Sequence, residues 1–139
     1  MAKNILKMNR GDTFSFNVVI EDPSTTNAVY KLKESDILYF AIMPPHSKFE
    51  DAEKNGGILR YFIAEDQSNA GSFEILLTPK DTKDLFPGVY YYSLKLQKLS
   101  IEDYEDASYL KNNFENFIGN FSLGEIKTVV PRAKFIINE

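Results

Sequence analysis

Apolar and polar residues alternate along much of this chain, and the segment Thr13–Glu21 shows the pattern most clearly. Phe14, Phe16, Val18 and Ile20 fall on one face of an extended segment, and mostly polar residues fall between them. Alternation with a period of two residues is typical of a β-strand with one buried face. The pattern therefore predicts a half-buried strand over this segment.

Similar segments recur at short intervals, and each ends at Gly, Pro, Asn or Asp. This spacing is typical of a β-sandwich or barrel, so we expect an all-β domain of seven or eight strands. The expected strands are Ile5–Met8, Thr13–Glu21, Asp36–Met43, Ile58–Ala64, Gly71–Thr78, Val89–Leu99, Gly124–Val130 and Arg132–Ile137.

Turn-forming residues between the expected strands also predict which strands pair with each other. Ile58–Ala64 and Gly71–Thr78 flank a polar, turn-rich segment, which predicts that they form a hairpin. A second hairpin is expected at the end of the chain, with Pro131 at its turn or at a bulge on an edge. Asp36–Met43 is apolar on both faces, which predicts a central strand. In Val89–Leu99 we expect the even-numbered residues from Tyr90 to Leu96 to form the core face.

Two segments depart from the strand pattern. Thr78-Pro79-Lys80-Asp81 has a capping residue, a proline at the first helical position and a carboxylate two residues later, which predicts a short helical turn near 79–86. Ser100–Leu123 is first acidic and then rich in aromatic residues at helical spacing, with acidic groups where a helix N-terminus favours them. We expect an amphipathic helical insertion near 104–119.

The apolar stripe of this insertion, residues 100–123, is the candidate protein–protein interface. Large apolar patches on small domains usually mark interfaces, although the stripe could instead pack on the edge of its own sandwich, and both interpretations remain open. The candidate residues are Tyr109, Leu110, Phe114, Phe117, Ile118 and Phe121.

Composition narrows the functional classes. The 139 residues fit a single domain spanning 1–139, and 43% hydrophobic residues, with 11 Phe and 8 Tyr, can form a substantial core. The absence of cysteine excludes disulfides and thiolate chemistry. A net charge of −4 argues against binding to nucleic acid or anionic lipid. We see neither a signal peptide nor an apolar run approaching roughly 20 residues, so we expect cytoplasmic synthesis and no membrane association.

Candidate chemistry is sparse. Arg10-Gly11-Asp12 is best interpreted as turn chemistry at the start of a strand, although it matches an integrin-binding tripeptide. His46 is the only histidine, so it supports neither a metal cluster nor a catalytic triad. We interpret the acidic cluster Glu102–Asp106 as a solvated face or the start of a helix, in preference to a calcium site or a glycosidase site. We therefore assign no catalytic residue, cofactor or metal.

Several stretches, taken in order, carry a family resemblance. They are Arg10–Phe14, Tyr39–Met43, Ile75–Thr82, Leu85–Tyr92 and Ile126–Ile137. Together they resemble the small immunoglobulin-like β-sandwich proteins of tailed bacteriophages, and they are similar to the N-terminal domain of the upper baseplate protein of siphophages that infect Gram-positive bacteria. The resemblance implies an immunoglobulin-like antiparallel sandwich.

The resemblance also implies a function. Members of this family are non-enzymatic structural parts of the virion, so we expect a component of the tail, baseplate or neck that is assembled in the host cytoplasm. Its expected partners are other virion proteins, with several copies in a symmetric assembly. One alternative is a carbohydrate- or cell-surface-binding module with outward Tyr and Phe residues. Another is a small hydrolase that uses the acidic cluster.

Overall fold

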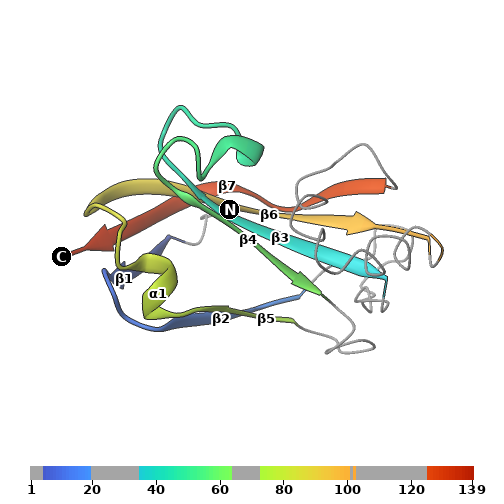
Figure 1. The fold of residues 1–139 in the computed structure, drawn as a ribbon, viewed down its shortest axis with the longest axis horizontal. Coiled ribbons are helices and arrows are strands. Elements are labelled where there is room, and N and C mark those ends of the chain that lie inside the picture. The colour runs from blue at the N-terminus through green and yellow to red at the C-terminus, as the bar shows by residue number, and fades with distance from the viewer. Residues whose placement is uncertain (1–4, 20–34, 64–72, 101, 103–124) are drawn as a thin grey trace.

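The computed structural model describes residues 5–19, 35–63, 73–100, 102 and 125–139 (Figure 1). Within them the chain forms seven strands, one helix of a single turn and one 3-10 turn. In chain order these are β1 (Leu6–Asn9), β2 (Phe14–Val18), β3 (Asp36–Met43), η1 (Phe49–Asp51), β4 (Ile58–Ile63), β5 (Phe73–Leu77), α1 (Pro79–Thr82), β6 (Gly88–Lys98) and β7 (Glu125–Asn138).

The strands form two sheets. A five-stranded sheet has the order β1-β7-β6-β3-β4, and β2 pairs with β5 in a second sheet. In Figure 1 the β2–β5 pair lies as a second layer below the larger sheet. The larger sheet is mixed, because β1 runs parallel to β7 while the other neighbouring strands are antiparallel. The predicted all-β class is confirmed.

Strand β3 is the central element that the sequence predicted. It has the expected bounds, it pairs with β4 on one side and β6 on the other, and all eight residues are buried. Leu38, Phe40 and Ile42 face the β2–β5 layer, whereas Ile37 and Tyr39 lie on the outer face of the larger sheet. Each such side chain contributes roughly 1.5–3 kcal/mol when it is fully buried. This double burial explains why the strand is apolar throughout.

The main core lies between the two sheets. Phe40, Tyr92 and Phe135 form an aromatic cluster, with ring centroids 6.1 Å apart for Phe40 and Tyr92 and 5.9 Å apart for Tyr92 and Phe135. Ile75 and Leu77 of β5 contribute to the same core from the smaller sheet. The predicted core face of β6 is confirmed, since its even-numbered residues from 90 to 96 are all buried there.

A second apolar cluster lies on the outer face of the larger sheet. The loop between β3 and β4 places Phe49 and Ala52 over this face, next to Met43. Gly57 lies where the loop meets β3, and a Cβ atom there would overlap the carbonyl oxygen of Ile42. Because any side chain would collide with backbone, the loop requires glycine at this position.

The expected hairpin of Ile58–Ala64 with Gly71–Thr78 is wrong. β4 pairs with β3, whereas β5 pairs with β2 in the other sheet. Both segments alternate, and alternation identifies a strand without identifying its partner. The chain therefore changes sheet between β4 and β5, and the turn-like sequence between them joins two layers.

The expected hairpin at the end of the chain is also wrong, because residues 125–138 form one continuous strand, β7. Its register against β6 shifts around Pro131. Tyr92 pairs with Ala133 and Lys95 pairs with Thr128, so an interval of three residues on β6 lies opposite an interval of five on β7. The bulge accommodates a residue without an N–H group, and the Ser93 hydroxyl donates to the carbonyl of Val130 at 2.7 Å. The bulge is the second of the two positions that the sequence predicted for Pro131.

The remaining expectations concern helices. α1 confirms the predicted helical turn, but it ends at Thr82, earlier than expected. The Asp81 carboxylate accepts hydrogen bonds from the backbone N–H of Thr78 at 2.8 Å and from its hydroxyl at 3.0 Å, which ties the first turn together. The expected insertion over 100–123 lies outside the described residues, apart from Ser100 and Glu102.

Candidate functional site

The structure describes few of the residues that the sequence nominated. The expected interface on the insertion, Tyr109, Leu110, Phe114, Phe117, Ile118 and Phe121, lies outside the described residues. Of the acidic cluster only Glu102 is described, and it is exposed. His46 is exposed in the loop after β3. Candidate surfaces must therefore be built from other residues.

The loop between α1 and β6 presents a large aromatic side chain to solvent. Leu85 is 3% exposed and anchors the loop in the core, whereas the next residue, Phe86, is 78% exposed. The hydroxyl of Tyr90 donates to the carbonyl oxygen of Phe86 at 2.8 Å, and the N–H of Leu85 donates to Thr82 at 3.1 Å. Burial raises the pKa of Tyr90, so this hydroxyl stays protonated at neutral pH. Phe86 is therefore held outward on a fixed loop, which sequence analysis did not identify.

Apolar and basic side chains share the neighbouring outer face of the larger sheet. Lys7, Ile136 and Val89 are directly paired across β1, β7 and β6, and Val89 is 48% exposed. Ile5, just before β1, is 53% exposed. Lys7 and Lys134 are exposed and form no ion pair with any residue that the structure describes. This face combines apolar area with positive charge.

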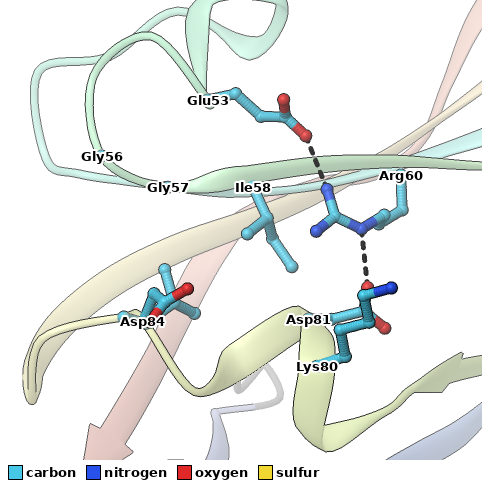
Figure 2. A pocket seen from close by; sticks show the side chains of 9 residues that line it. Glu53, Gly56, Gly57, Ile58, Arg60, Lys80, Asp81 and Asp84 are labelled. Atoms are coloured by element: carbon cyan, nitrogen blue, oxygen red, sulfur yellow. Dashed lines mark hydrogen bonds and ion pairs between the residues drawn. The ribbon is translucent and has the colours of Figure 1, made fainter. Parts of the chain in front are cut away.

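At the other edge of the larger sheet, strand β4, a polar clamp formed by Arg60, Asp81 and Glu53 joins the two layers. Arg60 of β4 donates from Nε to Asp81 at 2.8 Å and from Nη1 to Glu53 at 2.5 Å, and Figure 2 shows it lying between these carboxylates. Partial burial raises the pKa of Asp81, but hydrogen bonds from Arg60 and Thr78 outweigh it and hold this pKa below 3.8. A hollow of about 330 Å³ beside the clamp is lined by Gly56, Gly57, Ile58, Lys80, Asp84 and Leu85 as well as the three clamp residues.

Arg132, at the bulge of β7, holds the loop after β3. Its guanidinium donates to the carbonyl oxygens of Pro45 at 2.6 Å, Ser47 at 3.0 Å and Pro44 at 3.2 Å. The same guanidinium lies 4.9 Å from the centre of the Tyr91 ring. Arg132 therefore fixes the loop and occupies one face of an outward tyrosine.

Metal ligation, the carboxylates of the clamp and membrane spanning can each be assessed for the described residues. No group of three or more His, Cys, Asp or Glu side chains among them is arranged to hold a metal ion. The carboxylates at the clamp are already engaged by Arg60. None of the helices in the described part of the chain has the length and apolar character needed to span a bilayer.

No protein-family model matches the chain, and a search of curated proteins finds no significant match.

Proposed function

We propose that this chain is an immunoglobulin-like β-sandwich that serves as a non-enzymatic structural protein of a tailed bacteriophage particle. It binds neighbouring virion proteins in the tail, baseplate or neck, in several copies arranged symmetrically. The proposal joins the resemblance of five sequence stretches to the architecture and surface of the described residues.

Sheet topology supports the immunoglobulin-like part of the proposal. In immunoglobulin folds strands B and E share one sheet, and strands G, F and C lie side by side in the other, extended by C′ in variable-type domains. Here β2 pairs with β5, and the larger sheet runs β7-β6-β3-β4 with β1 added parallel to β7. Numbering β2 to β7 as B, C, C′, E, F and G reproduces that order.

One observation carries the proposal furthest: in the stretch Leu85–Tyr92, which bears the resemblance, the bond from Tyr90 to Phe86 is similar to the tyrosine corner of immunoglobulin folds. A tyrosine near the start of strand F that bonds back to the chain a few residues upstream is a hallmark of such folds. Tyr90 makes this bond to Phe86. The same corner displays Phe86, and a rigid, exposed aromatic side chain is the kind of residue that anchors protein interfaces.

The carbohydrate-binding alternative receives less support. A sugar-binding surface needs tyrosine faces that are open to solvent. On the outer sheet face, Tyr39 is fully buried and its hydroxyl donates to Gln97 at 2.7 Å, while Arg132 covers a face of Tyr91. These two described tyrosines are therefore engaged within the chain.

Immunogold electron microscopy of purified particles, with antibody against the chain, tests the proposal. Label at a defined position on tailed particles is the expected result and identifies neck, tail or baseplate. Absence of label on intact and opened particles, with antigen present in the lysate, would refute the virion role.

A pair of matched variants tests the contribution of the corner. We expect Phe86→Ser to reduce incorporation into particles by about tenfold or more, because a hot-spot aromatic typically contributes 2 kcal/mol or more to binding. Leu76→Ser is the control, since Leu76 is 43% exposed on the outer side of the smaller sheet. Equal incorporation of both variants would remove Phe86 from the interface.

A further inference from the structure

Strand β1 is an edge of the larger sheet, and part of its backbone points away from its neighbour β7. The N–H of Arg10 donates to the carbonyl oxygen of Asn138 at 2.7 Å, so the peptide groups of Leu6, Met8 and Arg10 point toward β7. Peptide groups alternate in direction along a strand, which directs those of Lys7 toward the outer edge. No described residue bonds to the backbone N–H or C=O of Lys7. This edge can therefore hydrogen-bond another strand.

The two faces beside this edge differ in chemistry. On the core side, Leu6 and Phe14 are only partly buried although they pack against the main core, and Phe14 lies 5.5 Å from Phe135 between ring centroids. On the outer side, Lys7 and Lys134 are exposed, and within the described part of the chain neither forms an ion pair. A hollow of about 360 Å³ at this edge is lined by Lys7, Met8, Asn9, Asp12, Thr13, Phe14 and Asn138.

We propose that the free edge of β1 binds an extended segment of another protein in which apolar and acidic residues alternate. The partner's backbone would pair with Lys7, its apolar side chains would cover Leu6 and Phe14, and its carboxylates would face Lys7 and Lys134. Strand addition of this kind takes affinity from main-chain hydrogen bonds and specificity from alternate side chains.

Charge argues against a second copy of this chain as the occupant. Two β1 strands paired edge to edge in antiparallel register would bring the two Lys7 side chains close together, and like charges across paired strands are destabilising. An acidic partner segment satisfies the same backbone groups and removes this repulsion. This inference deepens the proposed function, because it names the surface and the chemistry through which a virion neighbour would bind.

A peptide titration tests the edge independently of any virion. The purified chain, labelled with nitrogen-15, is titrated with a short peptide in which valine and glutamate alternate. We expect the amide exchange of Lys7 to slow by about tenfold or more at saturation, because the amide gains a hydrogen-bond partner. The control peptides replace glutamate with lysine or methylate alternate backbone nitrogens, and neither should protect Lys7. No protection by the acidic peptide, or equal protection by the lysine peptide, overturns the proposal.

The second test uses particles. Lys7→Pro removes the outward N–H at an edge position where proline is tolerated, and Lys7→Ala removes the charge but keeps the N–H. Circular dichroism and thermal melting establish that each variant folds. We expect Lys7→Pro to reduce incorporation about tenfold or more and Lys7→Ala to reduce it less, since main-chain bonds carry most of the affinity in strand addition.

The outcomes separate the edge from the proposed function. Normal incorporation of folded Lys7→Pro overturns the edge as the docking site and leaves a virion role intact. Absence of the wild-type chain from particles refutes the virion role, and the peptide titration then decides the edge alone. Self-association of the wild type that Lys7→Pro abolishes would identify a second copy as the occupant and overturn the acidic partner. If Lys7→Pro fails to fold, the peptide titration decides.

Discussion

The larger sheet ends in two edge strands that differ in how their backbone is covered. At the β4 edge, the N–H of Leu59 lies 3.5 Å from a carboxylate oxygen of Glu53. The carbonyl oxygen of Leu59 accepts a hydrogen bond from the Arg60 guanidinium at 3.0 Å. At the β1 edge, none of the described residues bonds to the backbone of Lys7. Among the described residues, side chains therefore cover part of the β4 edge, whereas the backbone of Lys7 on the β1 edge has no partner.

The difference follows from where the charged residues point. Arg60 is opposite Phe40 in the pairing of β3 with β4, so it lies on the core-facing side of an edge strand, where inward charge discourages a further strand from adding. Lys7 lies on the outer face instead, where it can meet a partner's carboxylates. The β4 edge holds the two layers together, whereas the β1 edge is suited to binding.

We expect the largest loss of stability from adding one methyl group at Gly57, just before β4. In Gly57→Ala the new Cβ would overlap the carbonyl oxygen of Ile42, so β3 and the loop that follows it must separate. We expect a loss of about 3 kcal/mol in the free energy of unfolding, near the upper end of typical overpacking costs. Urea unfolding followed by circular dichroism measures this loss.

Gly56→Ala is the matched control for that variant. Gly56 has φ of 96° but open space around its Cβ position, so alanine there meets backbone strain without a clash. We expect a cost of about 1 kcal/mol, typical of a left-handed non-glycine residue. If both variants lose the same free energy of unfolding, the close packing of Gly57 against Ile42 is not the cause of the loss.

Breaking the clamp should have the next largest effect. Arg60→Ala removes the hydrogen bonds to Asp81 and Glu53 and leaves a partly buried carboxylate, so we expect a loss of about 1.5–2 kcal/mol. Lys80→Ala is the control, because Lys80 lines the same hollow, is exposed and forms no ion pair with a described residue. Chemical unfolding of both variants at pH 7 makes the comparison, and a loss under about 0.5 kcal/mol for Arg60→Ala would show that the clamp does not stabilise the fold.

The clamp also predicts a pH dependence. Arg60 and Thr78 hold the pKa of Asp81 below 3.8, so its stabilising contribution is complete above that value and is lost as the pH falls through the lower pKa of the folded state. We expect Asp81→Asn to be about 1 kcal/mol less stable than wild type at pH 7, and the difference to shrink toward pH 2. Urea unfolding across this range measures it, and a difference that is constant with pH would exclude the ionised carboxylate as the cause.

The sequence predicted the elements better than their partners. The bounds of β3 and the core face of β6 could be derived because burial on both faces, or on one, leaves a direct pattern of apolar residues. The choice of partner leaves no such pattern: β4 and β5 both alternate, and packing between layers decides that they belong to different sheets. At Pro131 the residue type indicated a break in the ladder, but its form, a bulge within one strand, depends on the pairing with β6.

The described candidate surfaces were less predictable than the fold. The sequence of Leu85–Tyr92 carries the family resemblance, yet it does not show that Leu85 is buried while Phe86 is exposed beside the bond from Tyr90. The open edge at Lys7 depends on the pairing of β1 with β7, which comes from the opposite end of the chain. Local patterns cannot show whether a strand is an edge, because that property belongs to the sheet.

Amide hydrogen exchange of the unmodified chain gives the smallest and most direct comparison. Met8 points its N–H toward β7 and Lys7 points its N–H outward, so we expect the Met8 amide to exchange at least about 100-fold more slowly. On the β4 edge, the Leu59 amide has a weak bond to Glu53, so we expect its exchange rate to lie between those of the Met8 and Lys7 amides. Nuclear magnetic resonance measures all three rates in one sample. If Lys7 proves as protected as Met8, the β1 edge is already covered in the free protein, and the contrast between the two edges disappears.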